Sequence, residues 1–382
     1  GRKPRTGVGL QTILDGDELA RASDYFKFGG TRHSPDHRLE AWSADLRGSE
    51  FFTIRVRRWD TGEDLPDVLT QTGGSVVWGL DSTFFFYVQV DDNHRPLKVY
   101  RHRLGTPQAD DALIYEEKDT GWFTRIEESA SRRFCIIGGG DHDTSEQRLI
   151  DLAVPDATPR LIAPREKGVR YSAADRGDEL FILTNQGDAI DFRVVTAPLA
   201  DPGRANWREL VPHRPGTYIL GIELFAGHLV RLERANALPS IVVRDLGDGS
   251  EHLIAFDEAA YSLDMTGGYE FDTTTMRFSY SSMTTPAEVY DYDMASRVRT
   301  LRKRQEIPSG HDPALYVTTR ITAISHDGAE VPVSILHRRG LVHDGSAPLL
   351  LYGYGSYGMA MPASFSANRL SLVDRGFVYA IA

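Results

Sequence analysis

The sequence predicts a mostly β protein, in which a β-propeller precedes the first strands of an α/β domain. From residue 40 to residue 290, short apolar strands alternate with Asp-, Gly-, Ser- and Asn-rich turns, and helical periodicity is almost absent. Pairs of strands recur at intervals of 36 to 51 residues, the spacing of four-stranded propeller blades. After about residue 316 the pattern changes to strand, helix, strand.

Composition narrows the class of protein. The longest apolar stretches, such as "STFFFYVQV", are far shorter than the roughly 20 residues that span a bilayer. The net charge of -11 disfavours a phosphate-binding surface, so neither a membrane nor a nucleic acid is an expected partner. The single cysteine, Cys135, excludes an intrachain disulfide and fits a cytoplasmic location. Its apolar setting, "RRFCIIGG", predicts a buried strand residue rather than a nucleophile.

Residues 1–315 are assigned to the propeller. An apolar or aromatic strand, a polar turn and a second apolar strand recur six times, and residues 1–30 could add outer strands of one further blade. Bulky residues at equivalent strand positions pack blade against blade, so the repeated aromatics are predicted to be core. They are Trp42, Trp78, Phe123, Tyr171, Tyr218 and Tyr269.

Two polar clusters in this region have two interpretations each. Asp141, His142 and Asp143 could be metal ligands or a solvated turn; the turn is favoured because no second cluster with ligand spacing accompanies them, and no metal is predicted. The basic run Arg302, Lys303 and Arg304 fits an exposed linker better than a recognition patch.

Residues 316–382 are assigned to the start of the α/β domain. Alternating residues around Asp327-Gly328 predict a hairpin. A buried-type strand "APLLLYGYG", a helical segment "SFSANRLSLVDR" and a second buried-type strand "GFVYAIA" then follow, the order of a parallel α/β unit.

The loop after the first of these buried-type strands contains Gly353, Gly355 and Gly358 in the spacing G-x-G-x-x-G. A dinucleotide site requires a helix that opens at the third glycine and an acidic residue after the next strand. Pro362 follows Gly358 by four residues, and the next strand ends with the chain. An oxidoreductase is therefore disfavoured, and no cofactor is predicted.

An α/β-hydrolase accounts better for this loop. Counted from the hairpin, "PLLLYGYG" is the third strand, and in that fold the loop after the third strand supplies part of the oxyanion hole. Glycines allow close backbone approach and unusual dihedral angles. Tyr352, Tyr354 and Tyr357 offer phenolic donors, although all three could instead be core.

These residues resemble the prolyl oligopeptidase family of serine peptidases. The resemblance runs from about residue 40 to the end, and its specific parts are "GYGSYG" and "YSSMTTP" (280–286). Together with "LIYEEKD" (113–119) and "DGAEVPVS" (327–334), they most resemble the oligopeptidase B (protease II) branch. The resemblance implies a seven-bladed-type propeller followed by an α/β-hydrolase domain. It also implies a cytoplasmic endopeptidase that cuts short peptides after Arg or Lys with a Ser-Asp-His triad.

By this resemblance Tyr354 donates its hydroxyl to the oxyanion, while Tyr357 and Gly355 contact the substrate. The nucleophile motif G-x-S-x-G is absent, since Ser356 has Tyr354 two positions before it. The triad is therefore expected after Ala382, with the remainder of the peptidase domain as partner and short basic peptides as substrates. This fragment alone is expected to be inactive. The alternative is a stand-alone propeller that acts as a binding or scaffold module.

Overall fold

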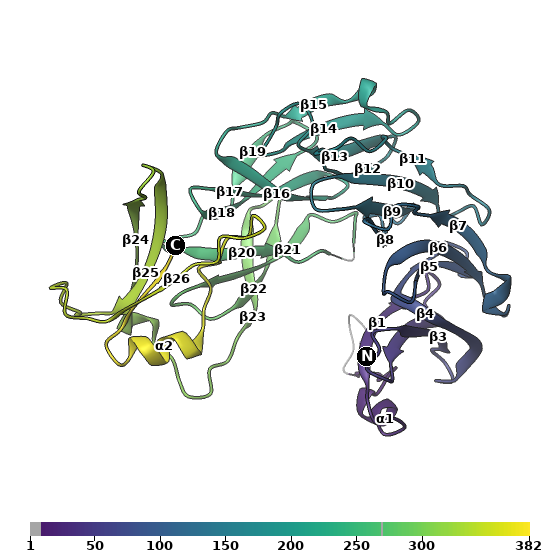
Figure 1. Cartoon of the computed structure of the whole chain (residues 1–382), viewed down its shortest axis with the longest axis horizontal. Coiled ribbons are helices and arrows are strands. Elements are labelled where there is room, and N and C mark those ends of the chain that lie inside the picture. The colour runs from purple at the N-terminus through teal and green to yellow at the C-terminus, as the bar shows by residue number, and fades with distance from the viewer. Residues whose placement is uncertain (1–8, 269) are drawn as a thin grey trace. The chain divides into compact units, whose positions relative to one another are not determined.

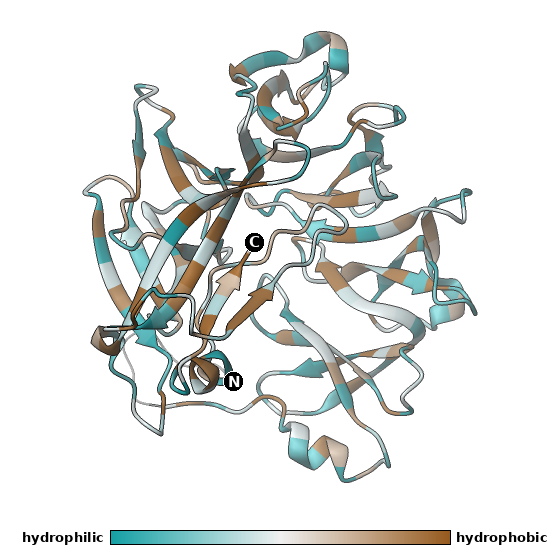
Figure 2. Cartoon of the chain, turned by 60° about the vertical axis from the view of Figure 1, so that its left-hand side comes forward, coloured by the Kyte–Doolittle hydropathy of each residue, from teal (hydrophilic) through white to brown (hydrophobic). Residues whose placement is uncertain are grey.

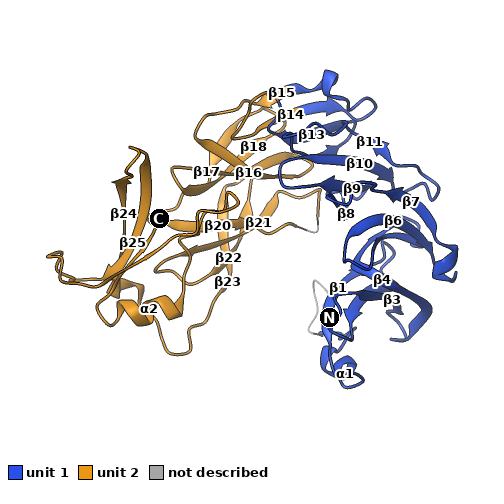
Figure 3. Cartoon of the chain, viewed as in Figure 1, with its two compact units in different colours: residues 1–186, 196–208 blue, residues 187–195, 209–382 orange. Residues whose placement is uncertain are grey.

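The computed structural model describes residues 9–268 and 270–382, and strands dominate it (Figure 1). Within these residues the α-helices are α1 (Gly16–Ala20) and α2 (Ala367–Val373), and neither is long or apolar enough to cross a membrane. Single 3₁₀ turns occur at Gln108–Asp110, Arg204–Asn206 and Pro313–Leu315. The chain forms two compact units, residues 1–186 with 196–208 and residues 187–195 with 209–382 (Figure 3).

The first sheet has seven strands in chain order, and each neighbouring pair is antiparallel. The strands are β1 (Lys27–His33), β2 (Leu39–Asp45), β3 (Phe52–Arg58), β4 (Asp64–Trp78), β5 (Phe84–Val90), β6 (Pro96–Arg103) and β7 (Ala112–Glu116). The long β4 pairs with β3 through its first half and with β5 through its second, with a register shift between Thr72 and Val76. The first two predicted repeats therefore share one sheet.

Four further sheets follow, each of four strands in chain order. They are β8 (Phe123–Glu128), β9 (Phe134–Gly140), β10 (Ser145–Asp151) and β11 (Arg160–Leu161); β12 (Tyr171–Arg176), β13 (Glu179–Thr184), β14 (Arg193–Pro198) and β15 (Arg208–Val211); β16 (Thr217–Leu224), β17 (His228–Ala235), β18 (Leu238–Asp245) and β19 (Glu251–Leu253); and β20 (Tyr261–Met265), β21 (Thr275–Ser282), β22 (Glu288–Asp293) and β23 (Val298–Arg304). These sheets confirm the predicted mostly β, propeller-type organisation.

Apolar side chains pack between successive sheets, and Figure 2 shows hydrophobic residues concentrated along the strands. In the first unit Phe84 and Phe86 of the first sheet meet Cys135 and Ile137 of the second. Cys135 is fully buried, and burial raises the pKa of its thiol, which confirms the predicted buried strand residue. In the second unit an equivalent cluster joins strands β17 and β18 to β21 and β22.

A buried ion cluster links strands of the first sheet. The His102 imidazole lies 2.9 Å from an Asp67 oxygen through Nε2 and 2.7 Å from an Asp111 oxygen through Nδ1. Burial alone would lower the pKa of His102, but hydrogen bonds and charges from the two carboxylates outweigh it and raise the pKa above 6.5. The Tyr87 hydroxyl donates to Asp111 at 2.9 Å, so the cluster ties β4, β5 and β6 to the segment before β7.

The repeated aromatics are only partly core. Trp42, Trp78 and Tyr171 are buried as predicted, and Tyr218 is half-buried. The prediction for Phe123 is wrong: its side chain is 49% exposed under the Arg95 guanidinium, because the preceding Trp122 occupies the buried position. Tyr269 lies outside the described residues; the first strand of that sheet, β20, runs from Tyr261 to Met265.

The basic run near residue 300 is part of a strand, which corrects the predicted linker. Arg302, Lys303 and Arg304 belong to β23, the edge strand of its sheet, and all three are exposed. Arg302 pairs with Asp291 of the neighbouring β22 at 2.9 Å, and Arg304 pairs with Glu288 at 2.6 Å. The run supports the sheet edge through cross-strand ion pairs.

The last sheet changes from antiparallel to mixed. It contains β24 (Tyr316–Ile324), β25 (Glu330–Arg338), β26 (Leu349–Tyr352) and β27 (Val378–Ile381) in the order β24-β25-β27-β26. The hairpin turns at Asp327-Gly328 as predicted, with Gly328 at φ +85°. β26 and β27 are parallel, and α2 between them buries Leu370 and Val373. The predicted strand, helix, strand unit is confirmed.

Candidate functional site around the glycine loop

The glycine loop runs from the end of β26 to the start of α2, where the Ser366 hydroxyl accepts the Arg369 N–H. Gly355 and Gly358 have φ of +69° and +66°, and a Cβ at either position would meet nothing within 4 Å. They are needed for backbone conformation rather than for space. Gly353 does not have a positive φ, so two of the three glycines make the turn.

The loop geometry differs from that of a dinucleotide-binding turn. No helix begins at Gly358; irregular backbone continues to Ser366, and α2 starts at Ala367. The peptide N–H groups that follow the third glycine therefore do not form a helix N-terminus that could hold a pyrophosphate. This geometry agrees with the preference for an oxyanion loop over a nucleotide site.

The three tyrosines of this segment are not core. Tyr352, Tyr354 and Tyr357 are 41%, 50% and 82% exposed, so none of them packs in the core of the described residues. Tyr357 also adopts a φ of +53°, a conformation that non-glycine residues rarely take. The Tyr354 hydroxyl makes no hydrogen bond to any residue in the described part of the chain, so its donor is available to another group.

Tyr354 and Gly355 line a cavity of about 260 Å³ within the second unit. The loop contributes one wall, from Met359 to Ala363, and β25 contributes Pro332 and Ser334. The propeller contributes residues of strands β16, β17, β18 and β20 and of the turn between β17 and β18: Leu220, Arg234, Ala237, Pro239, Tyr261, Ser262 and Leu263. Tyr357 is not among the lining residues, so of the three predicted site residues the cavity brings together two.

The far end of the loop is anchored on the segment "YSSMTTP" of β21. The Ser281 hydroxyl accepts the Phe365 N–H at 2.9 Å and donates to the Thr285 carbonyl at 3.1 Å. Met283 of the same segment is fully buried in one apolar cluster with Leu370 of α2 and Tyr379 of β27. The segment that follows the "GYGSYG" motif is therefore in direct contact with "YSSMTTP".

A half-buried carboxylate organises this anchoring segment. Glu258 accepts hydrogen bonds from the hydroxyls of Tyr280, Thr284 and Thr285 at 2.8, 2.8 and 2.6 Å. Burial alone would raise the pKa of Glu258, but the hydrogen bonds outweigh it and hold the pKa below 4.5. The charged carboxylate thus fixes the turn that presents Ser281 to the loop.

Sequence reasoning missed the propeller wall of the cavity. Leu220 lies at a β-bulge between Ile219 and Gly221, which turns its side chain out of the regular alternation. Ala237 lies in a two-residue hairpin turn in which both Asn236 and Ala237 have positive φ. The dipeptide Asn-Ala is a weak turn signal, and nothing in the sequence marked Arg234.

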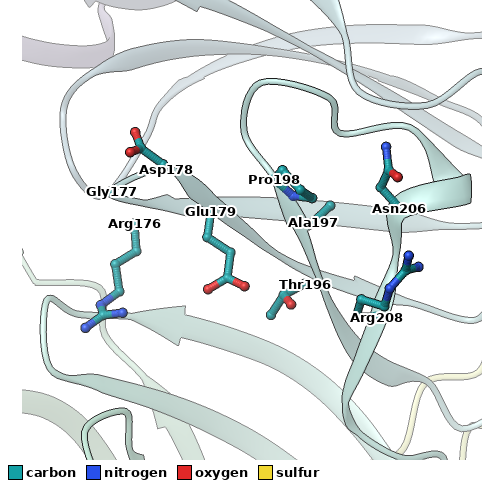
Figure 4. Close-up of a pocket in the computed structure, with 9 residues that line it drawn as sticks. All are labelled: Arg176, Gly177, Asp178, Glu179, Thr196, Ala197, Pro198, Asn206 and Arg208. Carbon is teal, nitrogen blue, oxygen red and sulfur yellow. The ribbon is translucent and has the colours of Figure 1, made fainter.

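A larger cavity, of about 710 Å³, lies on the sheet that contains β12 to β15 (Figure 4). Figure 4 shows Arg176, Glu179 and Arg208 among its lining residues. Among the described residues, histidine, cysteine and tyrosine do not line it. It therefore lacks the phenolic donor that Tyr354 offers at the glycine-loop cavity, which makes the latter the better candidate.

The cluster Asp141, His142 and Asp143 forms the turn between β9 and β10. Asp141 accepts the backbone N–H groups of Asp143 and Thr144, and Asp143 accepts the Thr144 hydroxyl. These contacts confirm the predicted turn. Groups of three or more metal-ligating side chains do not occur among residues 9–268 and 270–382.

Comparison with known proteins agrees with the propeller fold. Residues 2–305 match the family model for the prolyl oligopeptidase N-terminal beta-propeller domain. The chain is 40% identical to dipeptidyl aminopeptidase BI of Pseudoxanthomonas mexicana over 98% of its own length and 52% of that protein. It is 30% identical to protease 2 of Moraxella lacunata over 97% of this chain and 54% of that protein.

Solved structures show the same likeness. Oligopeptidase B from Trypanosoma brucei, with covalently bound antipain, superposes with a TM-score of 0.91 at 33% identity, over 100% of this chain and 55% of that one. Oligopeptidase B from Leishmania major superposes with a TM-score of 0.89 at 32% identity, over 97% of this chain and 53% of that one. The chain spans about half the length of these relatives. Because the family model covers most of the chain, this protein belongs to the prolyl oligopeptidase family and contains its N-terminal β-propeller domain.

Proposed function

We propose that the chain is the propeller and the first peptidase-domain strands of a serine-type oligopeptidase that cleaves short peptides. The carrying observation is the family match together with a glycine loop that holds an unpartnered tyrosine at a cavity. In this proposal residues 1–315 form the propeller and residues 316–382 begin an α/β-hydrolase domain. The parallel pair β26 and β27, with α2 between them, supports the second assignment.

Tyr354 is the proposed oxyanion donor. When a serine attacks a peptide carbonyl, negative charge collects on the oxygen, and a donor positioned beforehand stabilises that charge more than the neutral substrate. The Tyr354 hydroxyl has no partner in the described residues, and the positive φ of Gly355 sets the direction of the chain beside it. Gly355 and Tyr357 are the proposed substrate contacts.

The proposed substrates are peptides with Arg or Lys at the cut site, and the proposed location is the cytoplasm. The likeness to oligopeptidase B supports this specificity. The net charge of -11 adds weak support, since an acidic protein attracts cationic peptides. The specificity residues and the catalytic triad are expected in the part of the relatives' length that this chain does not match.

A scaffold role for a stand-alone propeller is less well supported. Such a module has no need for a loop with two left-handed glycines that presents a tyrosine hydroxyl at a cavity. The 382 residues nevertheless lack G-x-S-x-G, so we expect this polypeptide alone to hydrolyse nothing.

The proposal is tested with the whole protein and, in parallel, with residues 1–382. Both are incubated with a fluorophosphonate serine probe and with peptides that carry Arg, Lys or Pro before the cut site. We expect the whole protein to be labelled and to prefer Arg and Lys, and residues 1–382 to show neither labelling nor turnover. A whole protein without labelling or turnover would refute the peptidase, and labelling of residues 1–382 with turnover would refute the missing nucleophile.

In this proposal the propeller also restricts the peptidase to small substrates, and this restriction needs a separate comparison. If the propeller limits access, a short Arg peptide is cut while a folded protein with exposed Arg residues is spared. The same folded protein after denaturation, with its disulfides blocked, controls for sequence. Equal rates for the short peptide and the folded protein would rule out the restriction.

A further inference from the structure

We propose that the cavity beside Tyr354 is a subsite for a carboxylate-bearing residue of the peptide substrate, and that Arg234 binds this carboxylate. The inference rests on the proposed peptidase function and adds a specificity determinant on the propeller side of the site. It starts from the positive charge of Arg234, which has no ion-pair partner among the described residues.

Among the residues that the structure describes, Arg234 is the one charged side chain that lines the cavity. Its guanidinium lies 5.7 Å from the centre of the Tyr218 ring and forms no ion pair with any residue that the structure describes. Its neighbours differ: Arg231 pairs with Glu233 at 2.8 Å, and Arg214 pairs with Glu233 at 2.5 Å. Glu233 is thus committed to other arginines, and Arg234 lines the cavity without an ion-pair partner among the described residues.

The remaining lining suits one amino-acid residue with an acidic group. Met359, Met361, Pro332 and Pro362 form apolar walls, and methionine side chains adapt to different shapes. A guanidinium in partly apolar surroundings binds a carboxylate through two parallel hydrogen bonds, more strongly than it does in water. The volume of about 260 Å³ is below that of typical pockets for drug-sized ligands, roughly 300 Å³ and more, and matches a single residue.

The hairpin that carries Arg234 is held in place by the fold. Arg234 lies near the end of β17, just before the turn at Asn236 and Ala237, where φ is +49° and +54°. The Arg320 guanidinium of β24 donates to the Asn236 carbonyl and so holds this turn against the last sheet. Non-glycine residues in the left-handed region often mark ligand clamps. Arg234 therefore approaches the cavity from a rigid hairpin.

The cavity position limits where the carboxylate lies in the peptide. Tyr354 lines the same cavity, so a residue held by Arg234 is close in sequence to the bond whose oxygen Tyr354 stabilises. The carboxylate has two sources: an Asp or Glu side chain near the cut, or the C-terminal carboxylate of a short peptide. Both offer the same planar anion to a guanidinium.

The test uses the whole enzyme and three matched peptides with one Arg cut site. One carries Glu near the cut and a C-terminal amide, the second carries Gln in place of Glu, and the third is the Gln peptide with a free C-terminal carboxylate. We expect one carboxylate peptide to exceed the neutral one in kcat/KM by roughly 10- to 100-fold, the range of a hydrogen bond to a charged group. Whether the Glu or the C-terminal peptide gains identifies the source.

Three variants test whether the preference for a carboxylate peptide depends on Arg234. Arg234→Gln should bring the ratio of kcat/KM for acidic over neutral peptide close to one, and Arg234→Lys should keep part of it. Arg302→Gln removes the same charge from a residue that does not line the cavity, so its ratio should equal that of the parent. Thermal melts establish that each variant is folded. A parent ratio near one, or an unchanged ratio in Arg234→Gln, would overturn the inference.

Calorimetric titration of the same peptides separates this inference from the proposed function. If the protein hydrolyses none of the peptides but binds an acidic one at least tenfold more tightly, and Arg234→Gln loses that difference, the peptidase proposal fails and the subsite remains. If every peptide is cut at one rate and bound with one affinity, the subsite fails and the peptidase remains.

Discussion

Replacing Tyr354 with Phe removes one hydroxyl and leaves the ring in place. The Tyr354 hydroxyl has no protein partner in the described residues and the side chain is half exposed, so its loss breaks no hydrogen bond and opens no cavity. We therefore expect the melting temperature to stay unchanged. The cost should fall on the reaction, because one lost oxyanion donor typically lowers kcat by about 10²- to 10³-fold, or roughly 3 to 4 kcal/mol.

The assay is steady-state hydrolysis of an Arg peptide by the whole enzyme, with kcat and KM determined separately. KM should change little, since the donor acts on charge that develops only in the transition state. Tyr352→Phe is the matched control: it removes a hydroxyl of similar exposure from the last residue of β26, which does not line the cavity. If kcat of Tyr354→Phe stayed within about threefold of the parent, far less than a lost donor should cost, the loop would have only a structural role.

Other predictions concern stability. Ser281→Ala should leave the Phe365 N–H without its acceptor and lower the free energy of unfolding by about 1 to 3 kcal/mol, measured by urea denaturation; an unchanged midpoint would mean that the anchor is dispensable. The raised pKa of His102 gives stability that is complete below pH 6.5, its unfolded value, and is lost as the pH rises through the folded value. Melting temperature should therefore fall between neutral and alkaline pH, and His102→Gln should flatten that fall; a parallel profile would contradict the charged imidazole. Trp122→Ala should cost about 3 to 5 kcal/mol as a core truncation, whereas Phe123→Ala, at a half-exposed site, should cost much less. Equal losses would show that both rings are core.

Strand rhythm predicted the fold well because the signals are local. Asp, Gly, Ser and Asn turns separate the strands whatever their sheet, and apolar alternation marks each strand by itself. Strand-to-strand pairing depends on contacts between distant residues, so the sequence predicted it less well. Nothing in the run from Asp64 to Trp78 shows that its halves pair with different neighbours, so two repeats that look separate share one sheet. For the same reason Phe123 was predicted to be buried where the preceding Trp122 is. Alternation shows that every second side chain is buried, but packing decides which of the two faces that is.

The cavity beside Tyr354 likewise has one side that local sequence signals predicted and one side that they did not. The loop side was predictable because its glycines and tyrosines are contiguous in sequence, although which glycines take positive φ was not. The propeller side was not predictable because Leu220, Arg234 and Tyr261 come from separate strands. Their convergence depends on a bulge and a two-residue turn, and neither has a strong sequence signal here.

The contact between "YSSMTTP" and the segment that follows "GYGSYG" supports the end of the glycine loop. An oxyanion donor is effective only if it is positioned before the reaction, because reorganisation during the reaction would cost the energy that the donor supplies. The loop is held at its start, where the Tyr352 carbonyl accepts the Ala382 N–H at 3.0 Å, and at its end, where Ser281 holds Phe365. Between these points Gly355 and Gly358 adopt the left-handed conformations that the turn requires. If Tyr354 is the oxyanion donor that we propose, we expect "YSSMTTP" to support its position through the end of the loop, without touching substrate.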